Sequence, residues 1–188
     1  MGSGCEQFWA ELVERLRKFR LELHPEKTRP LEFGPGAAES RNPRSQGKPE
    51  TFNFLGFTHS CARTQKGRFT VLRQTMRTRW QAKLKDVKVQ LRRGLHLPIP
   101  EQGTYLRAVV VGHLRYYGVP MNGPALSAFR AAVGRLWWRV LRRRSQRHRL
   151  PWHRMWRYIN RWLPTVRIYH PYPLVRFGVF TQGGSRMR

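Results

Sequence analysis

The sequence predicts an α+β fold that is mostly α, in which a basic helical bundle follows a small segment of helix and β-hairpin. Apolar residues recur with the period of one helix face through the second half of the chain. Two Phe-containing runs near residues 52 and 69 flank a turn signal that contains Gly67. The 188 residues, of which 40% are apolar, suffice to bury a core in one domain with an appendage.

Residues 1–74 are expected to form the small mixed segment. An amphipathic helix over residues 7–19 is followed by a strand at residues 21–23. A loop rich in Gly, Pro and small residues then occupies residues 34–50. The segment ends in the β-hairpin, whose strands are predicted at residues 51–58 and 68–72.

Residues 75–165 are expected to form the helical domain. Four helices are predicted, over residues 75–94, over residues 103–118, from Pro124 to about residue 142, and from near Pro151 to Pro164. Pro98 and Pro100 separate the first two helices, and Asn122 is a candidate N-cap of the third. Residues 166–188 form a C-terminal arm with a candidate strand at residues 174–180.

The charge of the chain indicates a polyanionic partner. The sequence contains 37 Lys and Arg against 10 Asp and Glu, a net charge of +27. Such self-repulsion favours binding to nucleic acid first and to a membrane surface second. Most of the basic residues are Arg, which suits bidentate phosphate contacts and stacking on bases.

Basic residues on and around the predicted helices are therefore the candidate RNA contacts, together with one tyrosine that lies off its helix stripe. These residues are Arg73, Arg77, Arg79, Lys83, Lys88, Arg107, Arg115, Tyr116, Arg142, Arg143 and Arg144.

The aromatic residues divide by helical spacing. The apolar stripe of the second long helix includes His113 and Tyr117. Three tryptophans on apolar stripes are expected in the core, and two beside the stripes are expected to be exposed platforms. The first group is Trp80, Trp137 and Trp156, and the second is Trp138 and Trp162.

No catalytic residue and no metal site are predicted. Polymerase chemistry requires two or three carboxylates around two divalent ions. The sequence contains a single aspartate, Asp86, which is expected to pair within its helix with Lys83 or a nearby arginine. His59 with Cys61, and His148 with His153, lack the spacing of a zinc site.

The chain reads as an intracellular protein without a cofactor of its own. Its two cysteines, Cys5 and Cys61, form no CxxC pair, and its start lacks the apolar core of a signal peptide. No run approaches the roughly 18 apolar residues of a membrane span. We therefore expect a cytoplasmic location and no membrane span.

Several motifs, in order along the chain, carry a family resemblance. The runs LELHPEKTR (21–29) and TFNFLGFTH (51–59) resemble the late palm motifs of group II intron reverse transcriptases. The runs GHLRYYGVP (112–120), LSAFR (126–130) and RWLP (161–164) with HPYP (170–173) are similar to the maturase-specific thumb, called domain X. The resemblance extends over about residues 8–177.

The resemblance implies an RNA-binding, maturase-type module. Lys27 would lie near an incoming nucleotide, and Phe54, Leu55, Gly56 and Phe57 would form a primer-grip-like segment. The thumb would bind group II intron RNA and the RNA/DNA template–primer duplex, in a bacterial-type cytoplasmic ribonucleoprotein. The sequence departs from the family at Arg20, where a glycine is expected before the strand.

Two alternatives remain open from the sequence. The family's fingers and its Tyr-Ala-Asp-Asp strand-turn-strand should precede Phe8, and this sequence does not contain them. The chain is then the C-terminal part of an RNA-directed DNA polymerase, active only with a separate chain that supplies fingers and catalytic aspartates with their Mg²⁺ ions. The other alternative is a generic basic protein that binds nucleic acid or membrane surfaces.

Overall fold

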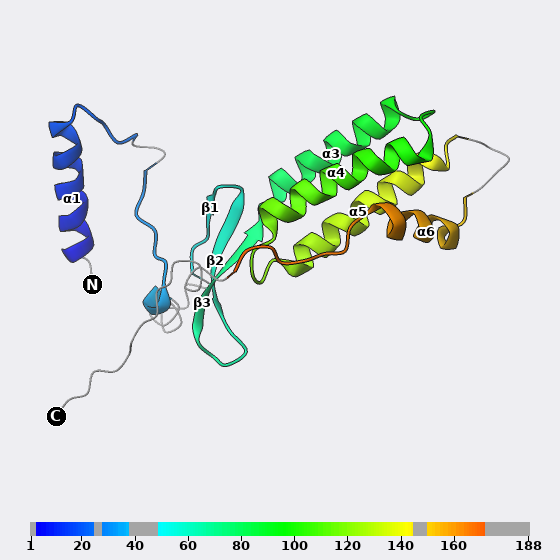
Figure 1. Cartoon of the computed structure of the whole chain (residues 1–188). Coiled ribbons are helices and arrows are strands. Elements are labelled where there is room, and N and C mark those ends of the chain that lie inside the picture. The colour runs from blue at the N-terminus through cyan, green and yellow to red at the C-terminus, as the bar shows by residue number, and fades with distance from the viewer. Residues whose placement is uncertain (1–2, 25–27, 38–48, 145–149, 172–188) are drawn as a thin grey trace. The chain divides into compact units, whose positions relative to one another are not determined.

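Contacts along the chain divide it into two units, Met1–Glu50 and Thr51–Arg188. The computed structural model (Figure 1) describes residues 3–24, 28–37, 49–144 and 150–171. The expected strand at residues 174–180 lies outside these residues. The α+β class predicted from the sequence is confirmed, since one small antiparallel sheet accompanies the helices.

The first unit is built on helix α1, Ser3–Lys18. The helix begins four residues before the predicted start and closes with two hydrogen bonds, from Arg20 N to Arg17 O and from Leu21 N to Leu16 O. This is the Schellman pattern, which places the residue after the helix in the left-handed region. Arg20 adopts that conformation, with φ of 57°. The turn expected of a glycine is therefore kept by an arginine, at a steric cost.

The strand expected at residues 21–23 is wrong. These residues form no regular secondary structure and pair with no strand among the described residues. Together with Trp9, Val13 and Arg17 of α1, they line a hollow of about 530 Å³. A strand requires a neighbouring strand to satisfy its backbone groups, and the described part of the first unit offers none.

The second unit begins with a three-stranded antiparallel sheet of order β1-β2-β3. Its strands are β1 (Phe52–Phe54), β2 (Phe57–Arg63) and β3 (Phe69–Thr75). A hairpin around Gly67 is confirmed, with φ of 75° at that glycine. The single strand expected over residues 51–58 is wrong, because Leu55 and Gly56 form a two-residue turn in which both φ values are positive.

Four helices follow the sheet, as predicted (Figure 1). They are α3 (Arg77–Arg93), α4 (Ile99–Tyr117), α5 (Gly123–Leu141) and α6 (Trp152–Trp162). Helix α4 begins four residues before the predicted residue 103, since Pro98 is its N-cap and Pro100 falls in its first turn. A proline is tolerated there because the first N–H groups of a helix have no intrahelical partner.

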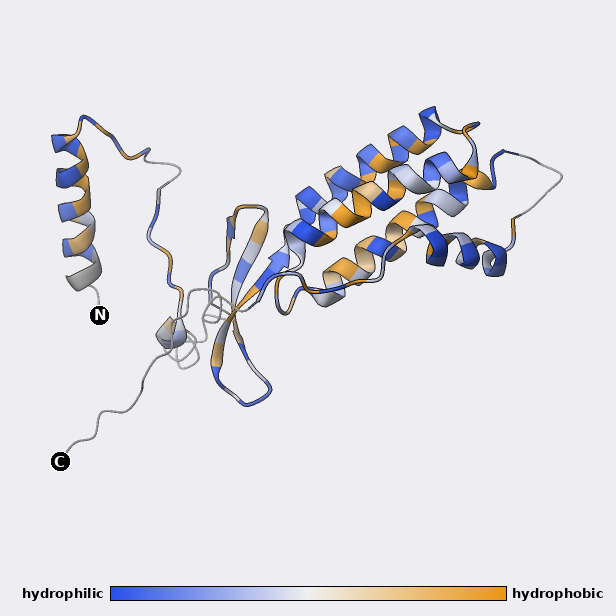
Figure 2. Cartoon of the chain, in the orientation of Figure 1, coloured by the Kyte–Doolittle hydropathy of each residue, from blue (hydrophilic) through white to orange (hydrophobic). Residues whose placement is uncertain are grey.

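The core lies around α5, which packs against α3, α4 and α6. Figure 2 shows hydrophilic residues dominating α3 and α6 and apolar residues gathering on α5. The largest buried side chain is Trp137, whose Nε1–H donates to Gln102 Oε1 at 2.8 Å. The amide nitrogen of Gln102 in turn donates to the carbonyl oxygen of Gly94. A tryptophan N–H that would be costly to bury alone is thereby satisfied.

Asn122 joins the sheet to the helices. It is the N-cap of α5 by position, as predicted, but its side chain makes no capping hydrogen bond. Its Oδ1 accepts from Thr75 N at 3.1 Å, and its Nδ2 donates to Thr75 Oγ1 and to Tyr117 O. The boundary expected between residues 74 and 75 falls beside this cluster, which ties the end of β3 to the α4–α5 connection.

Two glycines of α4 give a matched test of the packing. A Cβ built on Gly103 would lie 2.3 Å from the ring of Trp162, whereas a Cβ on Gly112 would meet nothing within 4 Å. We expect Gly103→Ala to lower the free energy of unfolding by about 2 kcal/mol through overpacking. Gly112→Ala should raise it by about 0.5–1 kcal/mol through helix propensity. Urea unfolding of the two variants measures both, and equal effects would contradict the packing of α6 on α4.

Candidate nucleic-acid interface

The positive charge is concentrated in the second unit. Residues 51–188 contain 28 of the 37 Lys and Arg but only two of the ten acids, Asp86 and Glu101. Within residues 51–144 and 150–171, no Lys or Arg forms an ion pair with an acid; the ion pairs found in the described residues belong to the first unit. Those cations of the helices that contact no other part of the chain are therefore available to an external anion.

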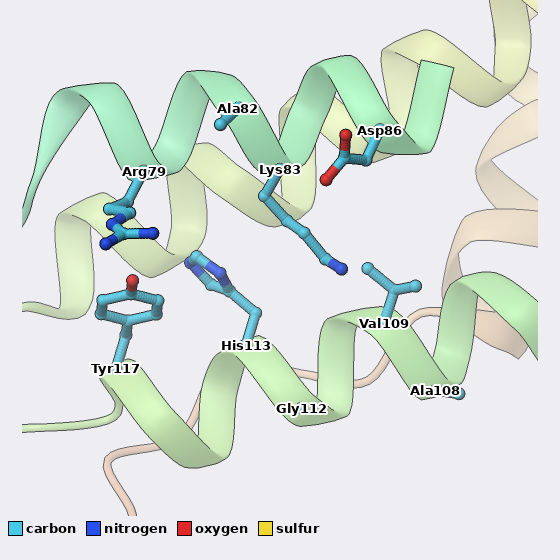
Figure 3. Close-up of a pocket in the computed structure, with 9 residues that line it drawn as sticks. All are labelled: Arg79, Ala82, Lys83, Asp86, Ala108, Val109, Gly112, His113 and Tyr117. Atoms are coloured by element: carbon cyan, nitrogen blue, oxygen red, sulfur yellow. The ribbon is translucent and has the colours of Figure 1, made fainter. Parts of the chain in front are cut away.

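One groove, of about 430 Å³, lies between α3 and α4 (Figure 3). Arg79 and Lys83 enter it from α3, and His113 and Tyr117 enter it from α4. Figure 3 shows the Arg79 side chain beside the Tyr117 hydroxyl and the Lys83 amine directed across the groove toward α4. The expected ion pair of Asp86 with Lys83 or a nearby arginine is wrong, because in the described residues Asp86 pairs with no cation and Lys83 extends across the groove rather than along its own helix.

A second groove, of about 370 Å³, lies between α3 and α5. Its cations are Lys85 and Lys88 from α3 and Arg135 and Arg139 from α5, around an apolar floor that includes Leu136. Lys88 was among the predicted RNA contacts, whereas the other three were not. Their signal in the sequence is the spacing of four residues between Arg135 and Arg139, which places two cations on one face of α5.

His113 lies between the first groove and the core. It is 7% exposed, and its ring stacks on Phe129 with a centroid distance of 3.6 Å. Its Nε2 atom has no hydrogen-bond partner in the described structure. Burial, and then the nearby charge of Lys83, lower the pKa of His113 to about 4. The imidazole is therefore neutral at pH 7, which keeps a further positive charge out of the core.

The end of α4 holds the turn between β1 and β2. The Tyr116 hydroxyl donates to Leu55 O at 2.9 Å, and the Tyr116 ring stacks over Phe57. Gly56 has a φ of 79°, and a Cβ there would lie 3.0 Å from the Tyr117 hydroxyl oxygen, so both the backbone conformation and the close approach favour glycine. The Phe54–Phe57 segment is therefore held against α4, and the side chains of Phe54 and Leu55 on it are 59% and 67% exposed.

The other predicted contacts are not brought to the two grooves. Arg77, Arg107, Arg115 and Arg143 are exposed at separate positions, and Arg73 is half-buried on β3. Arg142 lies 4.8 Å above the Trp138 ring. Arg144 donates to the carbonyl oxygen of Leu97, and burial lowers its pKa. Lys27 lies outside the described residues.

The tryptophans follow the sequence expectation in part. Trp137 is fully buried, as predicted, and Trp80 is partly buried against the core. The expectation that Trp156 is buried is wrong, because it is 49% exposed. Helix α6 buries Met155 and Ile159 instead, and Trp156 stands about 100° around the helix from Met155. Trp138 and Trp162, expected to be exposed, are partly buried.

Within the described residues, no three His, Cys, Asp or Glu side chains form a group that could hold a metal ion. None of the helices in this part of the chain combines the length and the apolar character needed to cross a membrane. Comparison of the chain with protein-family models, curated proteins and solved structures finds no match.

The low pKa of His113 predicts a pH dependence of stability. The unfolded chain binds a proton near pH 6.5, and the folded chain binds it only near pH 4. Stability that is present at pH 7 is therefore lost as the pH falls from about 6.5 toward 4. His113→Phe keeps an aromatic ring against Phe129 but cannot titrate. Between pH 7 and pH 4, we expect the unfolding free energy of the unmodified chain to fall by up to roughly 3 kcal/mol more than that of the variant.

Urea unfolding of both chains at pH 7, 5.5 and 4 makes this measurement. Curves of unfolding free energy against pH that stay parallel for the two chains would show that His113 titrates normally.

Proposed function

We propose that residues 51–171 form an RNA-binding module that grips the sugar–phosphate backbone of structured RNA. The observation that carries the proposal is the pair of grooves on either side of α3. Six cations, four from α3 and two from α5, line these grooves, and only Asp86 opposes them there. When cations with no acidic partner bind phosphates, counterions condensed on the nucleic acid are released. This release supplies much of the affinity for nucleic acid.

The grooves suit shape recognition rather than reading of bases. Their cations come from side chains at fixed positions on rigid helices, which can follow phosphates spaced along a folded strand. Double-stranded RNA is recognised mainly through its backbone and 2′-hydroxyls. The exposed hydroxyl-bearing and amide side chains of the helices, such as Gln81 and Thr78, are available for such contacts.

The sequence motifs support a particular RNA. The runs at residues 51–59, 112–120 and 161–164 resemble group II intron reverse transcriptases and their thumb. On this basis we propose a maturase-type role, in which the chain binds group II intron RNA and a template–primer duplex and aids splicing within a cytoplasmic ribonucleoprotein. The fixed position of the Phe54–Phe57 segment beside α4 agrees with a grip on a nucleic-acid strand.

A second candidate function is RNA-directed DNA polymerisation together with a separate chain. Helix α1 exposes Phe8, and the following turn exposes Phe19, with exposed fractions of 63% and 68%. These two residues, on the helix and directly after it, offer an apolar surface to a partner that would supply fingers and palm. The catalytic aspartates and their Mg²⁺ ions would belong to that partner, since Asp86 is the single aspartate of this sequence.

Salt dependence tests the grooves. Arg79→Gln with Lys83→Gln removes two cations from one groove, and Lys88→Gln with Arg135→Gln removes two from the other. For a double-stranded RNA hairpin, we expect the slope of log K against log salt to fall by roughly 1 for each phosphate that is no longer neutralised, about 2 for each pair. The measurement is a titration at several salt concentrations.

Lys66→Gln with Arg68→Gln is the matched control, because these exposed residues flank the β2–β3 turn and the change removes the same charge. A control slope that falls as much as the groove slopes would show that RNA senses only the net charge.

The identity of the RNA is a separate prediction. At physiological salt, we expect the chain to prefer a group II intron RNA over an unrelated structured RNA of equal length by about 100-fold, or roughly 2.7 kcal/mol. The maturase motifs provide the reason, and competition binding provides the measurement. Equal affinities would leave general RNA binding in place and remove the maturase assignment.

A further inference from the structure

A row of aromatic rings joins α5 to α6 on a part of the surface that the grooves do not include. The Trp138 and Trp152 rings meet edge-on with centroids 5.3 Å apart, and the Trp152 and Trp156 rings follow at 6.5 Å. Trp152 and Trp156 are 43% and 49% exposed. We refer to Trp138, Trp152 and Trp156 together as the tryptophan ledge.

The ledge is held in place at one end. The Trp138 Nε1–H donates to Leu150 O at 2.9 Å, which fixes the indole just before α6 begins. The guanidinium of Arg142 covers the same ring at 4.8 Å. Beneath Trp152 and Trp156, Met155 and Ile159 are buried in the core. Met155 and Ile159 therefore attach α6 to the core, while the rings of Trp152 and Trp156 stay exposed.

Exposing these rings to water is unfavourable in proportion to their apolar surface. Because the rings of Trp152 and Trp156 are not buried against the protein, a ligand that stacks on them would remove this unfavourable exposure. The residues around them define its charge. Residues 123–144 and 150–171 contain no acid, and α6 adds three exposed cations, Arg154, Arg157 and Arg161.

We propose that the tryptophan ledge is a stacking site for unpaired nucleotide bases. A nucleotide combines a flat ring that stacks on indole with a phosphate that arginine binds. The bases of a duplex are already stacked, so the ledge would take bases from loops, bulges or single strands. This site goes beyond the proposed backbone contacts of the grooves, because it recognises bases that duplex RNA does not offer.

A membrane surface fits the ledge less well. Helices that lie in the membrane interface bury a continuous apolar face among the lipids. In α6 that face, formed by Met155 and Ile159, is already buried among the helices of the bundle. Of the large apolar side chains of α6, Trp152 and Trp156 remain exposed, and exposed arginines lie between and beside them in the helix.

The test compares two ten-nucleotide single strands of equal charge, oligouridylate and the same ribose–phosphate chain without bases. For the full chain, we expect the strand with bases to bind about tenfold more tightly, with quenching of tryptophan fluorescence. Trp156→Ala should abolish this difference and leave binding of the base-free strand unchanged. Trp156→Phe should retain part of it, because phenylalanine still offers a ring.

The controls separate this site from the grooves. A thermal melt checks that Trp156→Ala folds, and Trp152→Ala is the second variant if it does not. Binding of a double-stranded RNA hairpin should be unchanged in both. Equal binding of the two strands by the unmodified chain would overturn the proposal. Loss of binding to anionic phospholipid vesicles in Trp156→Ala, with oligouridylate binding unchanged, would overturn it in favour of a membrane surface.

Failure of the groove variants to alter duplex binding would count against the proposed function alone, because discrimination between the two single strands does not depend on them.

Discussion

Electrostatic repulsion is the constraint on which the second unit depends. With 28 cations and two acids in residues 51–188, ion pairs cannot hold its elements together. Neutral hydrogen bonds between distant segments take that role. Asn122 ties β3 to the end of α4, and the Trp137 indole is satisfied by Gln102. Such bonds remain when salt screens charges, whereas surface ion pairs weaken.

Some of the arginines also serve the fold through backbone carbonyls. Arg130 donates from Nε to Pro164 O at 2.9 Å and from Nη2 to Leu163 O at 3.2 Å. These carbonyls lie just beyond the C-terminus of α6, where the helix dipole favours a positive charge. Burial lowers the pKa of Arg130. The arginines that the fold uses in this way are distinct from those that line the grooves, so structural and ligand-facing cations can be separated by mutation.

The sequence predicted the helices well because their signals are local. Pro124 and Pro151 mark helix starts through the geometry of a single residue, and the apolar stripes indicated the faces that became the core. The strand expected at residues 21–23 failed because a strand depends on a partner elsewhere in the chain. The turn at Leu55 was missed because leucine rarely adopts a positive φ. Trp156 was misplaced because it stands at the border of a stripe.

The candidate site could be predicted only as a set of basic residues. Arg79 and Lys83 lie one turn apart, and so their shared groove was implicit in the helix period. The helix period did not predict that Lys88 of α3 and Arg135 of α5 line one groove, because this depends on which faces of the two helices meet. The same limit applies to the tryptophan ledge, which combines one residue of α5 with two of α6.

The turn between β1 and β2 shows how this fold holds a strained segment in place. A left-handed conformation costs a non-glycine residue about 1–2 kcal/mol, and Leu55 adopts one with its side chain exposed. Burial of Leu55 therefore does not offset the strain. Two hydrogen bonds stabilise the turn instead, from Tyr116 to Leu55 O and from Met76 N to Gly56 O. The strained conformation of Leu55 therefore persists because the surrounding structure holds the turn in place. Tyr116 belongs to α4 and Met76 is the N-cap of α3, so both hydrogen bonds link the exposed apolar tip to the helices that border the α3–α4 groove.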